Sequence, residues 1–530
     1  MGEALGSQAP TIPPGEEDAT SSRNSTAAAG WDCAARGGVG SYRAMMPPER
    51  RLPILGLRRK SRSASWMRPS VLWRTRNDVV ARLLGDPTES TRRRWLEHVG
   101  ADPRTDLAVR PPPVQAPSFV LMGDPGEGDA SQYAVVPALR TAGAGTDFMV
   151  IVSDVIYPAG ESNDYVAKFA FPYRDYPAPI YALPGNHDWY DGLDGFMRVF
   201  CQEPGDPPLP KQPWRGGGVK GFLHRLLWRQ PSISDPVAAE AVRALRDDPA
   251  QRARQPAPYF MIDLEAVRLV CIDTGIRGVL DEQQGAWLRR ISSDSPKPKV
   301  LLTGKPLLVD GTLRPGQIEG GGTVEEIVRA PGHNYVMTVG GDIHNYQRYP
   351  VPVSDGRGVI QYVVSGGGGA FMHATHRIKA VDVSGVAETD FRCYPLRGDS
   401  LSFYSHLIRK RLLFRWLPEI PPDEAAALMG RRLGITPSRV EAGDTSAEVK
   451  VRLRSRFAAF VIGLLPPGPV FHRYFSEFFD WNEPPLFKSF LRLSVSGDEL
   501  RCDCCAATGC ADDERDPPVE DSFAVPLRSV

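Results

Sequence analysis

Short runs of apolar residues recur along the chain from about residue 115 onward, and each run ends in a polar or glycine-rich turn. Continuous apolar runs of four to six residues, separated in this way, are typical of strands that are buried on both faces. The pattern therefore predicts a layered α/β fold. The predicted strands are Phe119–Met122, Phe148–Val152, Ile180–Leu183, Leu269–Ile272, Val300–Leu302, Tyr335–Val339 and Gln361–Val364.

Helical segments fit between some of these strands, because capping residues precede stretches with apolar positions at helical spacing. The expected helices start at Asp129 or Ser131, with Tyr133, Val136 and Leu139 on one face; at Asp281, with Trp287 and Ile291 buried; and at Asp235-Pro236, running through Leu245. The last of these lies inside a segment rich in Pro, Arg and Trp, residues 204–256, which we interpret as an insertion. Long insertions of this kind often act as lids or specificity elements.

Changes in composition divide the chain into four parts. Residues 1–70 are rich in Gly, Ser, Ala, Pro and Arg without hydrophobic periodicity, which predicts a disordered basic tail. Residues 71–114 form a lead-in segment, and residues 115–394 contain the predicted strands. Residues 395–530 form a C-terminal accessory region of unknown role, in which Leu491–Val495 alternates like a strand.

The overall charge is balanced, with 63 basic and 63 acidic side chains, so the chain as a whole shows no bias toward nucleic acid. No secretory signal is evident at the N-terminus. The longest apolar run, Phe457–Val470, contains three prolines and is shorter than the ~20 residues that cross a bilayer. We expect a cytoplasmic protein without a transmembrane segment, and a peripheral membrane contact at this run stays open.

Four cysteines crowd near the C-terminus, at positions 502, 504, 505 and 510. Thiolates at such spacing can bind zinc, although the usual pairs separated by two residues are absent. The alternative is that they are ordinary strand residues or free thiols.

Polar clusters stand where four of the predicted strands stop. Open α/β sheets bind ligands outside the carboxyl ends of their strands, which is where these clusters lie. Carboxylate, imidazole, phenol and amide groups together suit hard-to-borderline divalent or trivalent metals. The clusters are Gly123-Asp124-Pro125-Gly126, Asp154-Val155-Ile156-Tyr157, Gly185-Asn186-His187-Asp188 and Gly341-Asp342-Ile343-His344.

In this order the clusters resemble the motifs of the calcineurin-like metallophosphoesterases, and within them the purple-acid-phosphatase-like variant. Gly126 stands where many members have a histidine, and Tyr157 stands at the spacing of the tyrosine that the variant uses instead. The resemblance covers residues 115–385. It implies a four-layer α/β/β/α sandwich and a hydrolase of phosphomonoesters or phosphodiesters with two Fe, Mn or Zn ions. The implied partner is a phosphorylated small-molecule or macromolecular substrate.

The resemblance also implies roles for individual residues. Asp124, Asp154, Tyr157 and His344 would hold the first metal, and Asp154 would bridge to the second, which Asn186 would also bind. His187 would stabilise the phosphoryl group or protonate the leaving oxygen, with Asp188 orienting its ring.

Two positions depart from the family pattern, and both belong to the second metal. Gly304 stands at the position of a ligand histidine, and Asp342 replaces the first histidine of the last motif. The second site could be weak and filled by substrate and water. His373 or His376 could supply the missing imidazole, or the ammonium of Lys305 could take the place of the second metal. These losses also leave open a degenerate member that binds a phosphorylated ligand or partner without turnover.

Overall fold

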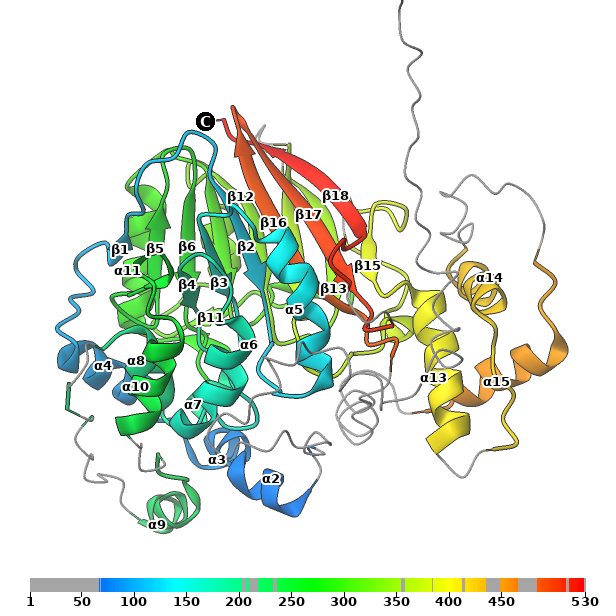
Figure 1. Cartoon of the computed structure of the whole chain (residues 1–530), viewed down its shortest axis with the longest axis horizontal. Helices are drawn as coiled ribbons and strands as arrows, with labels where there is room; N and C mark the ends of the chain where they lie inside the picture. Colours follow the sequence, from blue (N-terminus) through cyan, green and yellow to red (C-terminus); the bar gives the residue numbers. More distant parts are fainter. Residues whose placement is uncertain are drawn as a thin grey trace, which may run out of the picture.

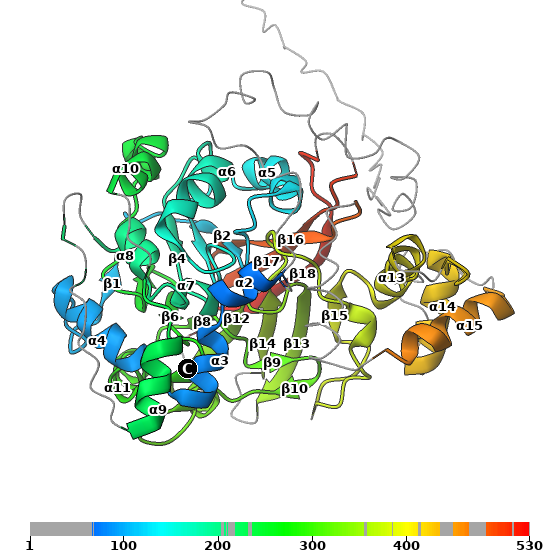
Figure 2. The ribbon, with the colours of Figure 1, turned by 90° about the horizontal axis from the view of Figure 1, so that it is seen from below.

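The computed structural model describes residues 66, 68–202, 206–207, 209, 218–231, 236–353, 358–383, 385–411, 415–434, 449–465, 484–510 and 514–528. Two β-sheets pack face to face, and helices cover their outer faces, as Figure 2 shows with α5, α6 and α10 on one side and α11 on the other. The predicted α/β sandwich is confirmed.

The first sheet has eight strands in the order β1-β5-β6-β8-β12-β14-β13-β15. Its central strands β6, β8, β12 and β14 are mutually parallel. Strand β5 pairs antiparallel with β6 and parallel with β1, and β13 pairs antiparallel with both β14 and β15. The strands are β1 (Ala108–Val109), β5 (Phe260–Asp263), β6 (Arg268–Ile272), β8 (Lys299–Thr303), β12 (Tyr335–Gly340), β13 (Tyr346–Val353), β14 (Gly358–Ser365) and β15 (Arg392–Tyr394). Two-stranded pairs are formed by β7 (Val279–Leu280) with β11 (Gln317–Ile318) and by β9 (Leu308–Val309) with β10 (Thr312–Leu313).

The second sheet has six strands in the order β18-β17-β16-β2-β3-β4 (Figure 1). Strands β2, β3 and β4 run parallel, and the C-terminal strands join them through the antiparallel pairing of β16 with β2. The region after residue 395 therefore supplies half of this sheet. The strands are β2 (Ser118–Met122), β3 (Phe148–Ile151), β4 (Ile180–Ala182), β16 (Lys488–Ser496), β17 (Glu499–Ala507) and β18 (Val519–Pro526).

The main core lies between the two sheets. Alternate residues of β2 and β3 point to opposite sides, so Phe119 and Leu121 join the core between the sheets, while Val120 and Met122 join a second core under the helices. The helices of this second core include α5 (Ala130–Ala142), α6 (Phe171–Tyr173), α8 (Asp194–Phe200) and α10 (Pro236–Leu245). On the far side, α11 (Glu282–Ser293) and α12 (Val324–Arg329) pack with the eight-stranded sheet.

The helix predictions hold with one correction. Asp281 caps α11, whose Trp287 and Ile291 are buried, and α10 ends at Leu245 as predicted. Asp129 caps α5 by accepting from the amides of Ser131 and Gln132. The buried face of α5 is wrong in the prediction: Ala134, Val135, Ala138 and Leu139 are buried, whereas Tyr133 and Val136 are only partly covered.

The insertion contributes to the sandwich itself. Its described helices are α9 (Gly218–Leu227) and α10, and Val242 of α10 is buried under the six-stranded sheet. The buried guanidinium of Arg246 donates hydrogen bonds to the carbonyls of Tyr173 and Ala178. The second half of the insertion is thus anchored to the core, which a simple lid would not be.

The lead-in segment folds into α3 (Asn77–Leu84) and α4 (Thr88–His98). Residues 1–65 of the predicted tail lie outside the described residues. Trp66 and the start of α2 (Pro69–Arg74), by contrast, are placed against the sandwich. No helix of the described residues is long and apolar enough to cross a membrane.

Candidate metal and phosphate site

Five candidate side chains lie at the carboxyl edge of the two sheets. Asp124 follows β2, Asp154 follows β3, Asn186 opens the short helix α7 (Asn186–Trp189) after β4, Lys305 follows β8, and Asp342 follows β12. Strands β2, β3 and β4 are parallel to one another, and so are β8 and β12, so the turns after them stand at the carboxyl ends of parallel strands.

The candidate ligands of the first metal converge on the hydroxyl group of Tyr157. This oxygen lies 3.1 Å from Oδ1 of Asp124, 3.2 Å from Oδ2 of Asp154 and 3.1 Å from Nε2 of His344. Ligand atoms that share a cation at roughly 2.0–2.2 Å lie about 3 Å from each other. The three atoms therefore lie around the phenol oxygen at hydrogen-bond distance, close enough to be candidate ligands of one cation.

The backbone at these carboxylates is in a conformation that ordinary side chains rarely adopt. Asp124, Asp154 and Asp342 have φ angles of 58°, 35° and 65°. Positive φ at a non-glycine residue costs about 1–3 kcal/mol and tends to occur at functional sites. Three such residues, after β2, β3 and β12, make this edge a candidate functional site.

Glycines let the backbone close around the carboxylates. A Cβ atom on Gly185 would lie 2.0 Å from Oδ1 of Asp154, and one on Gly366 would lie 2.6 Å from Oδ2 of Asp124. Gly366 opens the glycine run that follows β14, and farther along this run Gly368 and Ala370 donate backbone hydrogen bonds to the carbonyls of Gly123 and Asp124. The run therefore packs on the first strand-end turn.

Burial makes the carboxylate pair energetically demanding. Asp124 is fully buried and Asp154 nearly so. Burial, with the charge of Asp154 adding to it, raises the pKa of Asp124 well above its usual range. Burial also raises the pKa of Asp154, and His187 and Lys305 oppose that shift. A cation bound between the two carboxylates would offset this cost.

His344 presents one ring nitrogen to the site. Its Nδ1 atom lies 2.8 Å from the carbonyl oxygen of Phe371, and because a carbonyl can only accept, Nδ1 carries the hydrogen. The lone pair of Nε2 then faces the hydroxyl of Tyr157. A carbonyl that fixes the tautomer in this way is a common partner of metal-binding histidines.

His373 and His376 have structural contacts of their own. The ring of His373 stacks on that of His344 at 4.2 Å, and its Nδ1 accepts from the backbone amide of His344 at 3.1 Å. The Nδ1 of His376 lies 2.9 Å from the hydroxyl of Ser400, and its ring lines a hollow in the C-terminal helices. The contacts of His373 orient His344, and those of His376 belong to the helical region.

His187 is oriented by a backbone carbonyl, which corrects the predicted role of Asp188. The Nδ1 of His187 lies 2.7 Å from the carbonyl oxygen of Pro158. Asp188 instead accepts from the backbone amides of Val155, Ile156 and Gly185. The physical reason is its burial beside free amide groups: the carboxylate satisfies them and ties the second strand-end turn to the third.

Lys305 and Asp342 face each other across the second half of the site. The ammonium nitrogen of Lys305 lies 3.7 Å from Oδ1 of Asp342, and both side chains are partly accessible. The backbone amide of Asp342 donates to Oδ2 of Asp124 at 2.9 Å. Asn186, also partly accessible, donates from its amide to the hydroxyl of Tyr190 at 2.7 Å.

Gly126 and Gly304, where the resemblance led us to expect histidines, are held by close packing. A Cβ on Gly126 would lie 1.9 Å from the carbonyl oxygen of Val155. A Cβ on Gly304 would lie 2.9 Å from the hydroxyl of Thr274 and 3.2 Å from the carbonyl oxygen of Pro184. Neither position can take an imidazole without moving its surroundings.

Trp66 is a site residue that the sequence did not reveal. Its ring packs edge-on against Tyr157 at 4.8 Å, against His187 at 4.6 Å and against Phe371 at 5.6 Å, while its indole nitrogen is buried. It lies in the predicted tail, where isolated tryptophans among polar and small residues give no periodic signal. A large aromatic side chain is often buried, and this was the one feature of the sequence that could have indicated a contact of Trp66 with the fold.

One finding stands against a ready-made metal centre. Among the described residues, no group of three or more His, Cys, Asp and Glu side chains is arranged as a metal site. The carboxylate and imidazole atoms are grouped around the phenol oxygen of Tyr157, and not around an empty position that a metal ion could fill. Burial, with Asp124 and Asp154 adding to it, raises the pKa of that phenol well above its usual range, so metal binding here requires the phenol proton to leave.

The cysteines near the C-terminus do not converge. Cys502 and Cys504 point into the core between the sheets, and Cys505 points to the opposite face of β17. These three behave as buried strand residues.

Comparison with known proteins yields no match to any protein-family model or curated protein. Solved structures that are similar at low TM-scores include the following three. The purple acid phosphatase PPD1 from yellow lupin (Lupinus luteus) seeds has a TM-score of 0.36 and 11% identity over 78% of this chain. GAP50, the anchor in the inner membrane complex of Plasmodium, has a TM-score of 0.38 and 8% identity, and the match covers 78% of this chain and 89% of GAP50. PhoD has a TM-score of 0.36 and 11% identity, and the match covers 80% of this chain and 73% of PhoD.

The chain matches only 55% of the length of the lupin enzyme. The fold described above is defined by the strand order of the two sheets and by the two cores.

Proposed function

We propose that this chain is a metal-dependent hydrolase of phosphoric esters, acting at the carboxyl edge of its two sheets. The observation that supports this most is the convergence of Asp124, Asp154 and His344 on the hydroxyl of Tyr157. Two buried carboxylates, an imidazole and a phenol form a donor set for iron, zinc or manganese. The strained backbone at the carboxylates adds to this, since such strain is kept where function requires it.

The two halves of the site differ in their ligands. Asp124, Asp154, Tyr157 and His344 would hold the first metal. Asp154, Asn186 and Asp342 would hold the second, with fewer anionic and imidazole donors. When bound, such cations acidify a water molecule and neutralise the phosphoryl oxygens.

Of Lys305, His373 and His376, Lys305 is the best candidate to compensate for the imidazole ligand that the second half of the site lacks. Its ammonium already pairs with Asp342, and Gly304 beside it has no room for an imidazole. His373 and His376 are bound elsewhere, as described above. Lys305 would therefore hold a phosphoryl oxygen as a fixed positive charge.

His187 would move the proton. Because its Nδ1 hydrogen is donated to Pro158, its Nε2 atom is the one that can carry a proton to the leaving oxygen. Asp188 would act at a distance, by fixing the two turns that hold Asp154 and Asn186.

A second candidate is a protein that binds a phosphorylated ligand without turnover. It is favoured by the same ion pair of Lys305 with Asp342, because a cationic side chain there neutralises the position that a second metal would otherwise fill. Phosphate binding survives such a replacement more easily than water activation does.

The test is an assay of the purified chain with an aryl phosphate and an aryl phosphodiester in Mn, Zn and Fe. Hydrolysis should stop on chelation, return on adding metal, and be lost in Asp154→Asn. Asp247→Asn is the matched control and should keep full activity, because the Asp247 side chain is 76% exposed and pairs with the exposed Arg252. Bound metal without hydrolysis of either ester would favour the binding protein, and absence of both would contradict both candidates.

A spectroscopic prediction tests Tyr157 without relying on activity. If the tight site is loaded with ferric iron, a phenolate bound to it gives a charge-transfer band, so Tyr157→Phe should bleach the colour. Tyr165→Phe is the matched control, because this buried phenol donates to Asp188 and not to Asp124. Colour that persists in Tyr157→Phe, or is lost equally in both variants, would remove Tyr157 from the ligand set.

Mild chelation of the same preparation should remove one metal before the other, since the first half offers more ligands. Loss of two metals at equal rates would contradict this asymmetry.

A further inference from the structure

The C-terminal region contains a helical bundle beside the sandwich. It consists of α13 (Arg397–Arg411), α14 (Pro422–Leu433) and α15 (Leu453–Gly463), which project from one end of the molecule in Figure 2. The bundle has a small core of its own. That core is formed by Leu401, Ile408, Leu417, Ile420, Ala425, Met429, Ala458 and Ile462.

Helix α15 is apolar on two opposite faces. Ser455, Ala458 and Ile462 face the bundle and are buried. On the other side, Leu453, Phe457, Phe460 and Leu464 are 82%, 48%, 63% and 68% exposed. Their spacing of four, three and four residues places them in one stripe along the helix. Trp416, 58% exposed, extends the stripe, because its ring lies 6.0 Å from that of Phe457.

This stripe is unusual for a protein surface in water. A surface helix normally has one apolar face, which is buried, and a polar face toward water. Here one side packs on the bundle and the other carries four large exposed side chains, and contiguous patches of that kind mark interaction sites.

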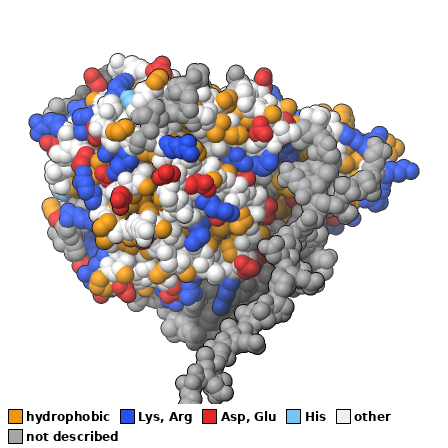
Figure 3. All heavy atoms as spheres, turned by 90° about the horizontal axis from the view of Figure 1, so that it is seen from above, with side chains coloured by type: hydrophobic (Ala, Val, Ile, Leu, Met, Phe, Trp, Pro, Cys, Tyr) orange, Lys and Arg blue, Asp and Glu red, His pale blue; other side chains and the backbone are white. Residues whose placement is uncertain are grey.

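The flanks of the stripe are basic. Helix α15 contains no acidic residue, and Arg454 and Arg456 are exposed on either side of the stripe. Arg432 of α14 lies nearby, at the hollow that Arg456 and Phe460 also line. Within the part of the chain that the structure describes, these three arginines form no ion pair. In Figure 3 basic and hydrophobic side chains are mixed at the end of the molecule that holds the bundle.

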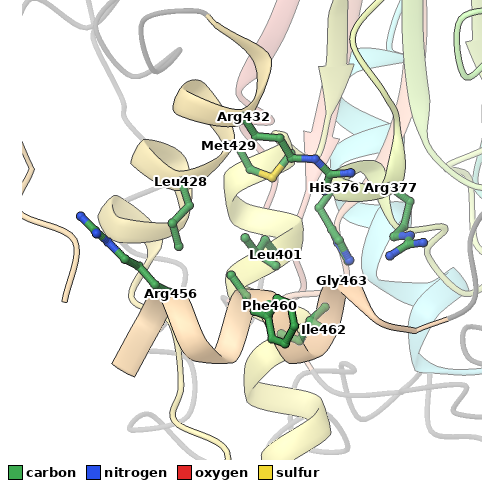
Figure 4. Close-up of a pocket in the computed structure, with 11 residues that line it drawn as sticks. His376, Arg377, Leu401, Leu428, Met429, Arg432, Arg456, Phe460, Ile462 and Gly463 are labelled. Atoms are coloured by element: carbon green, nitrogen blue, oxygen red, sulfur yellow. The ribbon is translucent and has the colours of Figure 1, made fainter. Parts of the chain in front are cut away.

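Behind the stripe lies a hollow of about 270 Å³ (Figure 4). Its floor is apolar, with Leu401, Leu428 and Met429, and Arg377 and Arg432 lie at its edge. Burial lowers the pKa of Arg377, and the like charge of Arg432 adds to that shift. Two guanidinium groups held near each other over an apolar floor suit an anionic head group with an apolar chain attached.

We propose that the bundle docks on an anionic lipid bilayer, with α15 lying in the plane of the interface. Leu453, Phe457, Phe460 and Leu464 enter the boundary between head groups and acyl chains, as in other interfacial helices. Arg432, Arg454 and Arg456 bind lipid phosphates at the same depth, where basic side chains are attracted to anionic lipid. A bilayer is favoured over a protein partner because the surface combines a long apolar stripe with cations of one sign on both flanks.

The experiment is co-sedimentation of the full chain with vesicles of equal parts phosphatidylcholine and phosphatidylglycerol, and with phosphatidylcholine alone. We expect binding to the mixed vesicles that weakens as salt is added. The pair Phe457→Ser with Phe460→Ser should lower the partition coefficient by about tenfold or more. The pair Arg454→Gln with Arg456→Gln should lower it by about fivefold per arginine, on the mixed vesicles only.

The matched control is Phe222→Ser on α9, because Phe222 is 65% exposed and lies at the other end of the molecule (Figure 2). All altered side chains are exposed, so thermal unfolding should match the wild type. Failure of the wild type to bind, equal binding to both vesicle types, or an equal loss in Phe222→Ser would overturn the proposal. A dimer in light scattering that the Phe457→Ser, Phe460→Ser pair abolishes, without vesicle binding, would assign the face to a second copy and overturn it as well.

Discussion

Replacing His187 by alanine should leave bound metal in place and lower kcat by roughly 10²–10⁴-fold, the range typical of a general acid–base group. Metal should stay because the contact of His187 with a ligand runs through its backbone: its amide donates to Oδ1 of Asp154 at 2.8 Å. Alanine keeps that amide. The measurements are metal content and steady-state hydrolysis of an aryl phosphate by the metal-loaded protein.

A second variant separates proton transfer from positioning. His187→Asn retains a side-chain NH group that can donate to the carbonyl of Pro158, but it cannot carry a proton to the leaving oxygen. Both variants should therefore be equally defective. Recovery of activity in His187→Asn would make the ring a positioning group, and unchanged kcat in both would take His187 out of the mechanism.

His333→Ala is the matched control for this pair. The Nδ1 of His333 lies 2.8 Å from the carbonyl of Ile327, and the residue precedes β12, at the opposite edge of the sheet from the site. Its loss should leave kcat unchanged.

The strands and the candidate ligands could be predicted because both depend on local sequence. Each buried strand is a continuous apolar run, and the polar residues that follow it in the chain must lie at the sheet edge. This reasoning located Asp124, Asp154 and Asp342 without any knowledge of which strands are neighbours. The meeting of Asp124 and Asp154 at Tyr157 then depends on parallel pairing, which the alternation of strands and helices favours.

The remaining features depend on contacts between distant parts of the chain. Pairing of β16 with β2 joins residues more than 350 positions apart, and no local pattern in either strand specifies it. The role of Asp188 depends on which amides its carboxylate meets after folding. Trp66 reaches the site from a segment whose composition predicts disorder. The face of α5 that is buried is chosen by the angle at which the helix meets the sheet, and Tyr133 and Val136 lie to one side of that contact.

The lead-in segment is also held by contacts with distant parts of the chain, through the buried side chain of Arg92. Arg92 on α4 forms ion pairs with Asp273, at 2.7 Å, and with Asp281, and all three side chains are almost completely buried. Asp281 also caps α11, and Asp273 accepts from the indole of Trp189 at 2.8 Å. Trp189 closes α7, the helix that carries Asn186 and His187. The ion pair of Arg92 with Asp273 and the hydrogen bond from Trp189 to Asp273 thus join the lead-in segment to the turn after β4.

We therefore expect Arg92→Met to destabilise the protein by about 3–5 kcal/mol, because it leaves two buried carboxylates without their cation. The measurement is the free energy of unfolding in urea. Arg93→Met is the matched control. Arg93 lies on the same helix, is exposed and pairs with the exposed Glu89, so its loss should change stability by less than about 0.5 kcal/mol.

Adding Asp273→Asn and Asp281→Asn to Arg92→Met separates the cost of two unpaired buried carboxylates from the cost of lost packing. If uncompensated charge is the reason, removing both carboxylates should return part of the lost stability, since neutral side chains cost less to bury than unpaired ions. If packing of the guanidinium against Trp189 is the reason, at 5.2 Å from the indole ring, the triple variant should be no more stable than the single one. An Arg92→Met variant as stable as the wild type would show that the lead-in segment is not held by this charge cluster at all.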